Sequence, residues 1–239
     1  SFISDVKDYF SINEKPITTL KSIGNFYVIG KGFLKKYIKT LSKLSLSKKA
    51  VKKYGKKLKL VYTPLHGTGF KPVTSILKKL GISYTLVEEQ AMADSAFSTV
   101  EVPNPENKEA YELALIYARE HDADLILCTD PDADRIGIAF KDSKGEYQLY
   151  TGNQTGALLI EYVLSQKKAK GILSSNGVVF NTIVTSSLGG KIAKTYDVSV
   201  ESLLTGFKFI GSRIHYYSKT REKTFEFGYE ESYGYLLSS

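Results

Sequence analysis

Apolar and polar positions follow two kinds of pattern along the chain. Up to residue 56 the apolar residues, among them Phe33, Tyr37 and Leu41, recur near every 3.6 positions, which predicts a mostly helical segment. From residue 57 short apolar runs alternate with helical patterns. We predict strands at 57–63, 82–87 and 125–128, helices at 71–80 and 107–120, and a hairpin of 136–140 with 147–150.

A second round of alternation follows residue 150. It predicts helices at 154–164, 182–194 and 209–217, and strands at 171–174, 198–204 and 224–227. Alternating strands and helices indicate the α/β fold class, here two consecutive three-layer α/β units with mixed, largely parallel sheets. We place the boundary near Tyr150, giving units at residues 1–150 and 151–239. The second unit stops soon after a strand, so we expect it to be truncated at its carboxyl end.

Composition narrows the class of protein. The 239 residues are 42% hydrophobic and 24% charged, as in ordinary globular proteins, and no apolar run approaches the length of a membrane span. Cys128 is the single cysteine, which excludes an intrachain disulfide framework and a multi-cysteine zinc site. The first residues lack the pattern of a signal peptide, so we expect a cytoplasmic protein without a membrane partner.

Positive charge is concentrated in the first quarter of the chain. The net charge is +8, and residues 1–59 hold fifteen lysines against three acidic residues. Only four of the 33 basic residues are arginines, the residue type that nucleic-acid readers favour for bidentate contacts. We therefore interpret the lysines as a solvated face and predict no nucleic-acid partner.

Three aspartates alternate directly after the predicted strand at 125–128. Asp130, Asp132 and Asp134 can point to one side if the loop is extended, at the carboxyl end of a strand where α/β proteins gather their ligands. Three adjacent carboxylates repel one another without a cation, and carboxylate oxygens suit a hard ion. We therefore predict a Mg²⁺ site, with Arg135 beside it to hold an anionic phosphate. The alternative is an acidic turn in which Arg135 pairs with an aspartate.

The segment Asp130–Arg135, D-P-D-A-D-R, resembles the D-G-D-A-D-R metal loop of the α-D-phosphohexomutases, the family of phosphoglucomutases and phosphomannomutases. Pro131 departs from the family pattern and removes one backbone N–H. Three further stretches resemble the family in the expected order. They are Y-T-P-L-H-G-T-G at 62–69, T-G-F-K-F-I-G at 205–211, and G-Y-E-E-S-Y-G at 228–234, the last closest to the branch of phosphoglucomutases and phosphopentomutases.

The resemblance implies an isomerase that interconverts hexose 1-phosphate and hexose 6-phosphate through a phosphoserine and a bisphosphate intermediate. It implies that Glu230 and Ser232 bind sugar hydroxyls, that Thr205 and Gly206 contact the sugar or its phosphate, and that Arg135 contacts phosphate. It favours glucose 1-phosphate and glucose 6-phosphate as partners but leaves mannose and pentose phosphates open. The serine motif of the family, which is of the type T-A-S-H-N-P, is absent here, so we expect a fragment covering the second and most of the third domain. We expect it to be inactive alone and capable of self-association.

Two other functions fit parts of the sequence. An apolar strand running into D-x-D also opens the HAD-type phosphatases, in which Asp130 would be the nucleophile, although Asp134 stands where Thr or Val is usual. The lysine-rich segment is also consistent with a non-enzymatic module that binds sugar phosphates or nucleic acids.

Overall fold

The computed structural model describes residues 5–8, 10, 12, 16–22, 24 and 26–237, so the predicted unit ends at residues 1 and 239 lie outside it. Residues up to Tyr37 form one compact unit, and those from Ile38 form another. The amino-terminal helices are α1 (Ile17–Ser22), α2 (Lys31–Leu41) and α3 (Lys48–Tyr54). Among the residues up to 56 that the structure describes, these helices take up 24 of 45, which confirms the predicted helical segment in part.

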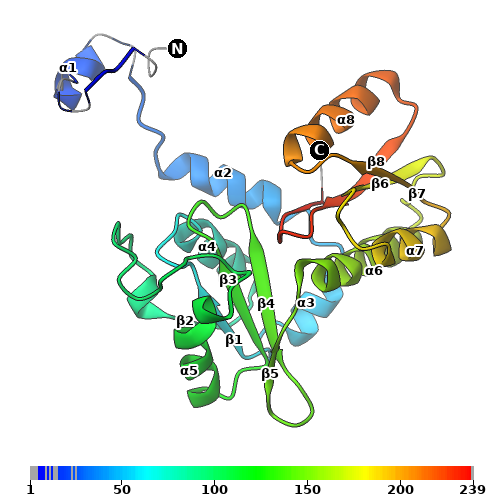
Figure 1. Cartoon of the computed structure of the whole chain (residues 1–239), viewed down its shortest axis with the longest axis horizontal. Helices are drawn as coiled ribbons and strands as arrows, with labels where there is room; N and C mark the ends of the chain where they lie inside the picture. Colours follow the sequence, from blue (N-terminus) through cyan, green and yellow to red (C-terminus); the bar gives the residue numbers. More distant parts are fainter. Residues whose placement is uncertain are drawn as a thin grey trace. The chain divides into compact units, whose positions relative to one another are not determined.

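The first sheet has five strands in the order β2-β1-β3-β4-β5. The strands are β1 (Leu60–Thr63), β2 (Tyr84–Leu86), β3 (Leu125–Thr129), β4 (Ile136–Lys141) and β5 (Tyr147–Leu149). The first three run parallel, whereas β4 and β5 are antiparallel additions. Helix α4 (Phe70–Leu80) joins β1 to β2, and α5 (Glu112–Glu120) precedes β3 (Figure 1), with short 3₁₀ helices at Glu88–Gln90 and Lys108–Tyr111.

Small side chains let α5 pack closely on this sheet. Ala114 and Ala118 of α5 are buried in one cluster with Val61, Ile126 and Cys128 of the strands. Because side chains alternate along a strand, the next residue, Tyr62, points to the other side of the sheet. Its buried hydroxyl lies 2.9 Å from Thr129 Oγ1. The sheet is therefore packed on the face that α5 covers and held by a buried polar contact on the other.

The second sheet has four strands in the order β7-β6-β8-β9, of which β9 is antiparallel. They are β6 (Gly177–Thr182), β7 (Ser199–Leu203), β8 (Thr224–Tyr229) and β9 (Tyr235–Leu236), with helices α6 (Gly152–Ala169), α7 (Leu188–Thr195) and α8 (Phe207–Thr220). Val179 of β6 is buried in a cluster with residues of α6 and α7. Its neighbours Val178 and Phe180 are buried with Ile210 of α8. Helices thus cover both faces, which confirms the predicted three-layer α/β class with mixed sheets.

The sequence prediction placed the central strand of this sheet wrongly. The strand was expected at 171–174 with a helix from Thr182, but β6 ends at Thr182 and α7 begins at Leu188. Helix α6 runs on to Ala169, and Gly171 follows with a φ of 66° in the turn after the helix. All six residues of β6 are buried because the strand is paired on both edges and covered on both faces. Strand β9 was not predicted. Within the described residues, every helix is too short or too polar to traverse a lipid bilayer.

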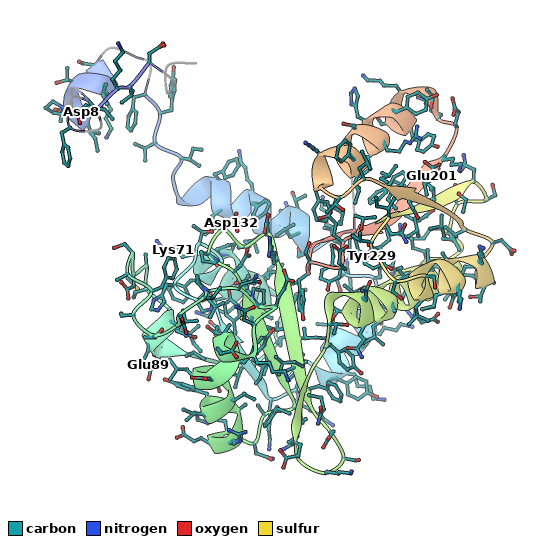
Figure 2. All side chains as sticks on the ribbon, in the orientation of Figure 1. Asp8, Lys71, Glu89, Asp132, Glu201 and Tyr229 are labelled. Atoms are coloured by element: carbon teal, nitrogen blue, oxygen red, sulfur yellow. The ribbon has the colours of Figure 1, made fainter. Side chains whose placement is uncertain are left out.

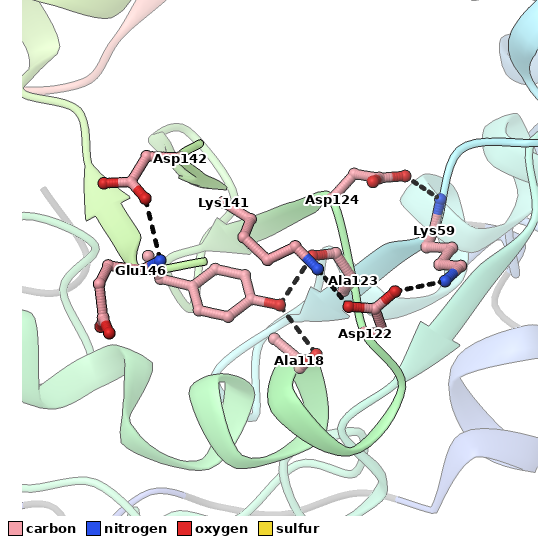
Figure 3. Close-up of polar contacts among 9 residues, drawn as sticks. Lys59, Ala118, Asp122, Ala123, Asp124, Lys141, Asp142 and Glu146 are labelled. Atoms are coloured by element: carbon pink, nitrogen blue, oxygen red, sulfur yellow. Dashed lines mark hydrogen bonds and ion pairs between the residues drawn. The ribbon is translucent and has the colours of Figure 1, made fainter. Parts of the chain in front are cut away.

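A surface cluster of charges joins the residue before β1, the loop before β3 and the end of β4 (Figure 3). Asp122 accepts hydrogen bonds from Lys141 and from Lys59, the latter at 2.6 Å. The two ammonium groups lower the pKa of Asp122 to about 2. The carboxylate therefore stabilises the fold above its unfolded pKa, near 4, and this contribution is lost as the pH falls toward 2.

Replacing this carboxylate tests the pH dependence. We expect Asp122→Asn to lower the Tm at pH 7 by about 1–2 °C, a small effect because the pair is exposed. The difference from wild type should shrink as the pH falls from 4 to 2. Thermal unfolding followed by circular dichroism measures it, with Glu120→Gln as the charge-matched control. A difference that stays constant down to pH 2 would contradict this assignment.

Candidate metal centre

The three aspartates of the loop after β3 come together at the carboxyl end of the strand. One carboxylate oxygen of each of Asp130, Asp132 and Asp134 lies within 4.8 Å of the others. Asp130 is buried, whereas Asp132, labelled in Figure 2, and Asp134 are exposed. The loop is not extended as expected. It turns at Ala133, which has a φ of 62° and donates its N–H to the Asp130 carbonyl at 3.1 Å.

The loop after β1 packs against the aspartate loop and forms hydrogen bonds with it. Thr68 donates both its N–H, at 2.8 Å, and its hydroxyl, at 3.1 Å, to the carbonyl of Pro131. Gly67 lies so close that a Cβ there would come within 2.5 Å of Pro131 Cα and 2.8 Å of the Asp130 carbonyl oxygen. Glycine is therefore required at this point by the backbone of the aspartate loop. The histidine before it, His66, is buried and both of its ring nitrogens have partners, Met92 O and Thr99 Oγ1, which is typical of a structural residue.

A methyl group at Gly67 is predicted to displace the aspartate loop. We expect Gly67→Ala to lower the free energy of unfolding by about 1–3 kcal/mol, because the clash is with backbone that cannot move cheaply. Mn²⁺ binding, measured by electron paramagnetic resonance, should weaken with it. Gly211→Ala is the control, because a Cβ added there would meet no atom of another part of the chain within 4 Å and alanine favours a helix. A Gly67→Ala protein with wild-type stability and metal binding would refute this role.

The electrostatics of the aspartate loop favour a bound cation. Burial, together with the neighbouring Asp132 and Asp134, raises the pKa of Asp130 to about 6, against the lowering effect of the hydrogen bond from the Arg135 N–H. That N–H donates to Asp130 Oδ1 at 2.9 Å. Burial and the neighbouring carboxylates thus disfavour the ionised form of Asp130, and a bound divalent cation, which prefers oxygen ligands, would stabilise that form. The three aspartates fit a Mg²⁺ ion by their chemistry and their convergence.

Arg135 points among carboxylates. Its Nη1 lies 2.8 Å from Glu106 Oε1, and its Nε lies 3.9 Å from both Asp130 and Asp134. The contacts with Asp130 and Asp134 agree with the alternative interpretation of the loop as an acidic turn in which Arg135 pairs with an aspartate. Since the side chain is 38% exposed, it can still reach an external anion. Its contact with phosphate stays a prediction. Glu106 was missed from sequence, because 29 residues separate it from Arg135.

The predicted sugar-binding segments meet at Glu230. This buried carboxylate follows β8, and its Oε1 accepts the N–H of Gly206 at 2.6 Å. Gly206 has a φ of 119°, in the region that favours glycine, while Thr205 beside it is exposed. Ser232 lies in the turn between β8 and β9 and is partly exposed. The structure therefore brings Glu230 and Gly206 into contact and leaves Thr205 and Ser232 accessible to a ligand.

The turn between β8 and β9 also contacts the first sheet next to the aspartate loop. The N–H of Ile136, the residue after Arg135, donates to the carbonyl of Tyr233 at 3.0 Å. Gly152, at the start of α6, lies so close that a Cβ would come within 1.9 Å of the Glu231 carbonyl oxygen. The candidate metal loop and the candidate sugar loop are therefore neighbours in space.

Glu231 is a supporting residue that sequence reasoning did not single out as such. Its Oε2 accepts hydrogen bonds from the hydroxyls of Thr182, at 2.9 Å, and Thr185, at 3.1 Å. These contacts fix the turn to the carboxyl end of β6. The only signal in the sequence was its place beside Glu230 in the G-Y-E-E-S motif.

Comparison with known proteins identifies the family. The model of phosphoglucomutase/phosphomannomutase α/β/α domain II matches residues 35–145, and that of domain III matches residues 151–239. The chain belongs to the phosphoglucomutase/phosphomannomutase family. It is 43% identical over 180 residues to the phosphoglucomutase of Staphylococcus epidermidis and 39% identical over 180 residues to that of Staphylococcus aureus. Each match covers 75% of this chain but 32% of the relative, so the chain spans about a third of the length of these curated relatives.

Solved structures of family members share the fold. A protein from Thermus thermophilus that is named a putative phosphomannomutase superposes with a TM-score of 0.64 at 20% identity, and the match covers 85% of this chain and 42% of the Thermus chain. An N-acetylphosphoglucosamine mutase from Aspergillus fumigatus, solved with GlcNAc-6P and magnesium, gives 0.54 at 16% identity, covering 82% and 40%. Family membership leaves the phosphatase interpretation of Asp130 without support.

Proposed function

We propose that this chain is the central part of a Mg²⁺-dependent phosphoglucomutase that interconverts glucose 1-phosphate and glucose 6-phosphate. The observation that carries the proposal is the contact between Ile136 and Tyr233. It sets three convergent carboxylates beside the turn that bears Glu230 and Ser232. A metal site and a polar sugar site that adjoin are what phosphoryl transfer to a sugar hydroxyl requires.

The aspartates and their neighbours have distinct roles in this proposal. Asp130, Asp132 and Asp134 hold Mg²⁺, which when bound acts as a Lewis acid on the transferring phosphoryl group. Arg135 contacts the phosphate. Its side chain extends toward the phosphate from its position beside Glu106 and the aspartates. The positive charge of its guanidinium compensates negative charge that a phosphate brings to the loop.

The second sheet supplies the contacts to the sugar. Glu230 is fixed by its hydrogen bond from Gly206, which leaves its second carboxylate oxygen to accept from a sugar hydroxyl. Ser232 donates to another hydroxyl, and Thr205 contacts the sugar or its phosphate. The choice of glucose rests on the names of the Staphylococcus relatives, and the Aspergillus structure with GlcNAc-6P and magnesium supports a sugar-phosphate substrate and this metal.

The proposed enzyme needs a phosphoserine that this chain does not contain. No Ser-His pair occurs in the sequence, so we place the serine in another segment of the full-length enzyme. We therefore propose that the 239-residue chain alone has no mutase activity. The two matched family domains also support our proposed division at residues 1–150 and 151–239, with the boundary near Tyr150.

Binding of glucose 1,6-bisphosphate with Mg²⁺ tests the proposal on this chain. We expect isothermal titration calorimetry to show one site that Glu230→Gln weakens about tenfold, because a carboxylate acceptor is replaced. Ser218→Ala, an exposed serine of α8, is the control for losing a hydroxyl. The wild-type chain should show no conversion of glucose 1-phosphate in a coupled assay. Bisphosphate binding that ignores Glu230→Gln, or turnover at the rate of a full-length mutase, would overturn the proposal.

A further inference from the structure

The basic charge of the chain is gathered into one long segment. Between Glu14 and Glu88 the sequence has no aspartate or glutamate, yet this stretch contains 17 lysines. The segment includes α3 and α4 of the second compact unit. Lysines without nearby acidic residues raise the local electrostatic potential and attract anions.

Some of these lysines line a pocket of about 390 Å³ between α3 and the end of α4. Lys48, Lys52 and Lys56 follow one another at intervals of four residues, which places them on one side of α3 and of the turn after it. Lys79 contributes from α4. The remaining lining residues are Ser42, Ser45, Val51, Leu80 and Gly81.

The two walls of this pocket are fixed to each other by a close backbone contact. Gly55, the residue after α3, is buried, and a Cβ there would come within 2.6 Å of Val51 O and 3.2 Å of Ile82 Cγ1. Its carbonyl accepts the N–H of Ser83 at 3.2 Å. The end of α3 is therefore held against the end of α4, so the pocket is formed before a ligand arrives.

Among the described residues, the four lysines have no acidic partner. Across residues 26–237 and the shorter described stretches before them, the ion pairs use other basic residues, and none joins Lys48, Lys52, Lys56 or Lys79 to a carboxylate. Four like charges around one pocket repel each other, and a multiply charged anion would relieve that repulsion. Lysine binds phosphate as a point charge, and the hydroxyl of Ser45 adds a polar group, whereas that of Ser42 already donates to the Lys39 carbonyl at 2.9 Å.

We propose that this pocket is a second anion site, which binds a small ligand carrying two or more phosphate groups. Its volume lies in the range of small-molecule sites, and its concave form suits such a ligand better than a polymer. The pocket is separate from the metal centre. Lys56 precedes the amino end of β1, whereas the aspartates follow the carboxyl end of β3, which runs parallel to β1. The proposal therefore stands independently of the mutase function.

Inorganic tripolyphosphate is the probe for this site. In EDTA at low ionic strength, calorimetry should show saturable binding of one tripolyphosphate per chain. The double variant Lys52→Gln/Lys56→Gln should weaken it about tenfold, because two exposed charge contacts are lost. Lys191→Gln/Lys219→Gln removes the same charge from α7 and α8 and should change the affinity less than twofold. Asp132→Asn should leave it unchanged, which separates this site from the metal centre.

Three results would overturn the proposal. The first is the absence of saturable binding to the wild-type chain. The second is an equal loss in both double variants, which would show an effect of net charge alone. The third is binding of a single-stranded oligonucleotide that is tighter than that of tripolyphosphate and strengthens with its length, since the lysines would then serve a polymer.

Discussion

Asp132→Asn is expected to weaken Mn²⁺ binding to this chain by about 100-fold. The variant removes one of three anionic ligands, and the affinity of an oxygen site for a divalent cation depends on its ligand charge. Asp132 is the best position for the test because its side chain is exposed, whereas that of Asp130 is buried. The wild-type chain should bind one Mn²⁺, which Mg²⁺ displaces.

The measurement is a titration of free Mn²⁺ by electron paramagnetic resonance. Glu112→Gln, an exposed change on α5, removes the same charge away from the loop and should leave the affinity as in wild type. Circular dichroism should show unchanged folding of both variants. Equal binding by wild type and Asp132→Asn would mean that the carboxylates do not share a metal.

Lys167→Met is expected to lower the free energy of unfolding by about 3–5 kcal/mol. Lys167 of α6 and Glu226 of β8 form a largely buried ion pair, with 2.6 Å between Nζ and Oε2. Glu226 Oε1 also accepts the N–H of Ser174 at 3.0 Å. Removing the ammonium group leaves a buried carboxylate with one hydrogen bond and no compensating charge, which is the costly way to break such a pair.

Urea denaturation of three variants separates the cause from loss of packing. Lys167→Met combined with Glu226→Leu should recover most of the lost stability, because no charge then remains buried. Recovery should be incomplete, since the Ser174 N–H loses its acceptor. Lys170→Met, exposed just beyond the end of α6, should be nearly neutral. A Lys167→Met cost no larger than that of Lys170→Met would refute this account of the pair.

The sequence predicted the features that depend on local pattern. Alternating aspartates after an apolar strand predicted that Asp130, Asp132 and Asp134 converge, and they do so. The route of the loop was not predictable, because it depends on the left-handed conformation of Ala133, a residue type that rarely adopts it. Support from Gly67 and Thr68 was also hidden, since it arises only when β1 and β3 are neighbours.

Long-range contacts explain the remaining differences between the predicted and the observed structure. Strand β6 was misplaced because an apolar run buried on both faces lacks the alternation that marks a half-exposed strand. The hydrogen bond between Glu230 and Gly206 joins two motifs 24 residues apart in sequence. Resemblance to a family placed both motifs in one site, but their contact is visible only in the folded chain.

Our central claim is that the three aspartates bind a metal ion next to the loop that binds the sugar. An anomalous difference map from crystals of this chain grown with Mn²⁺ and glucose 1,6-bisphosphate tests it most directly. The proposal predicts one strong peak bound by an oxygen from each of Asp130, Asp132 and Asp134, with the bisphosphate in contact with Glu230. A bound bisphosphate with no peak at these aspartates, or a peak at another site, would contradict it.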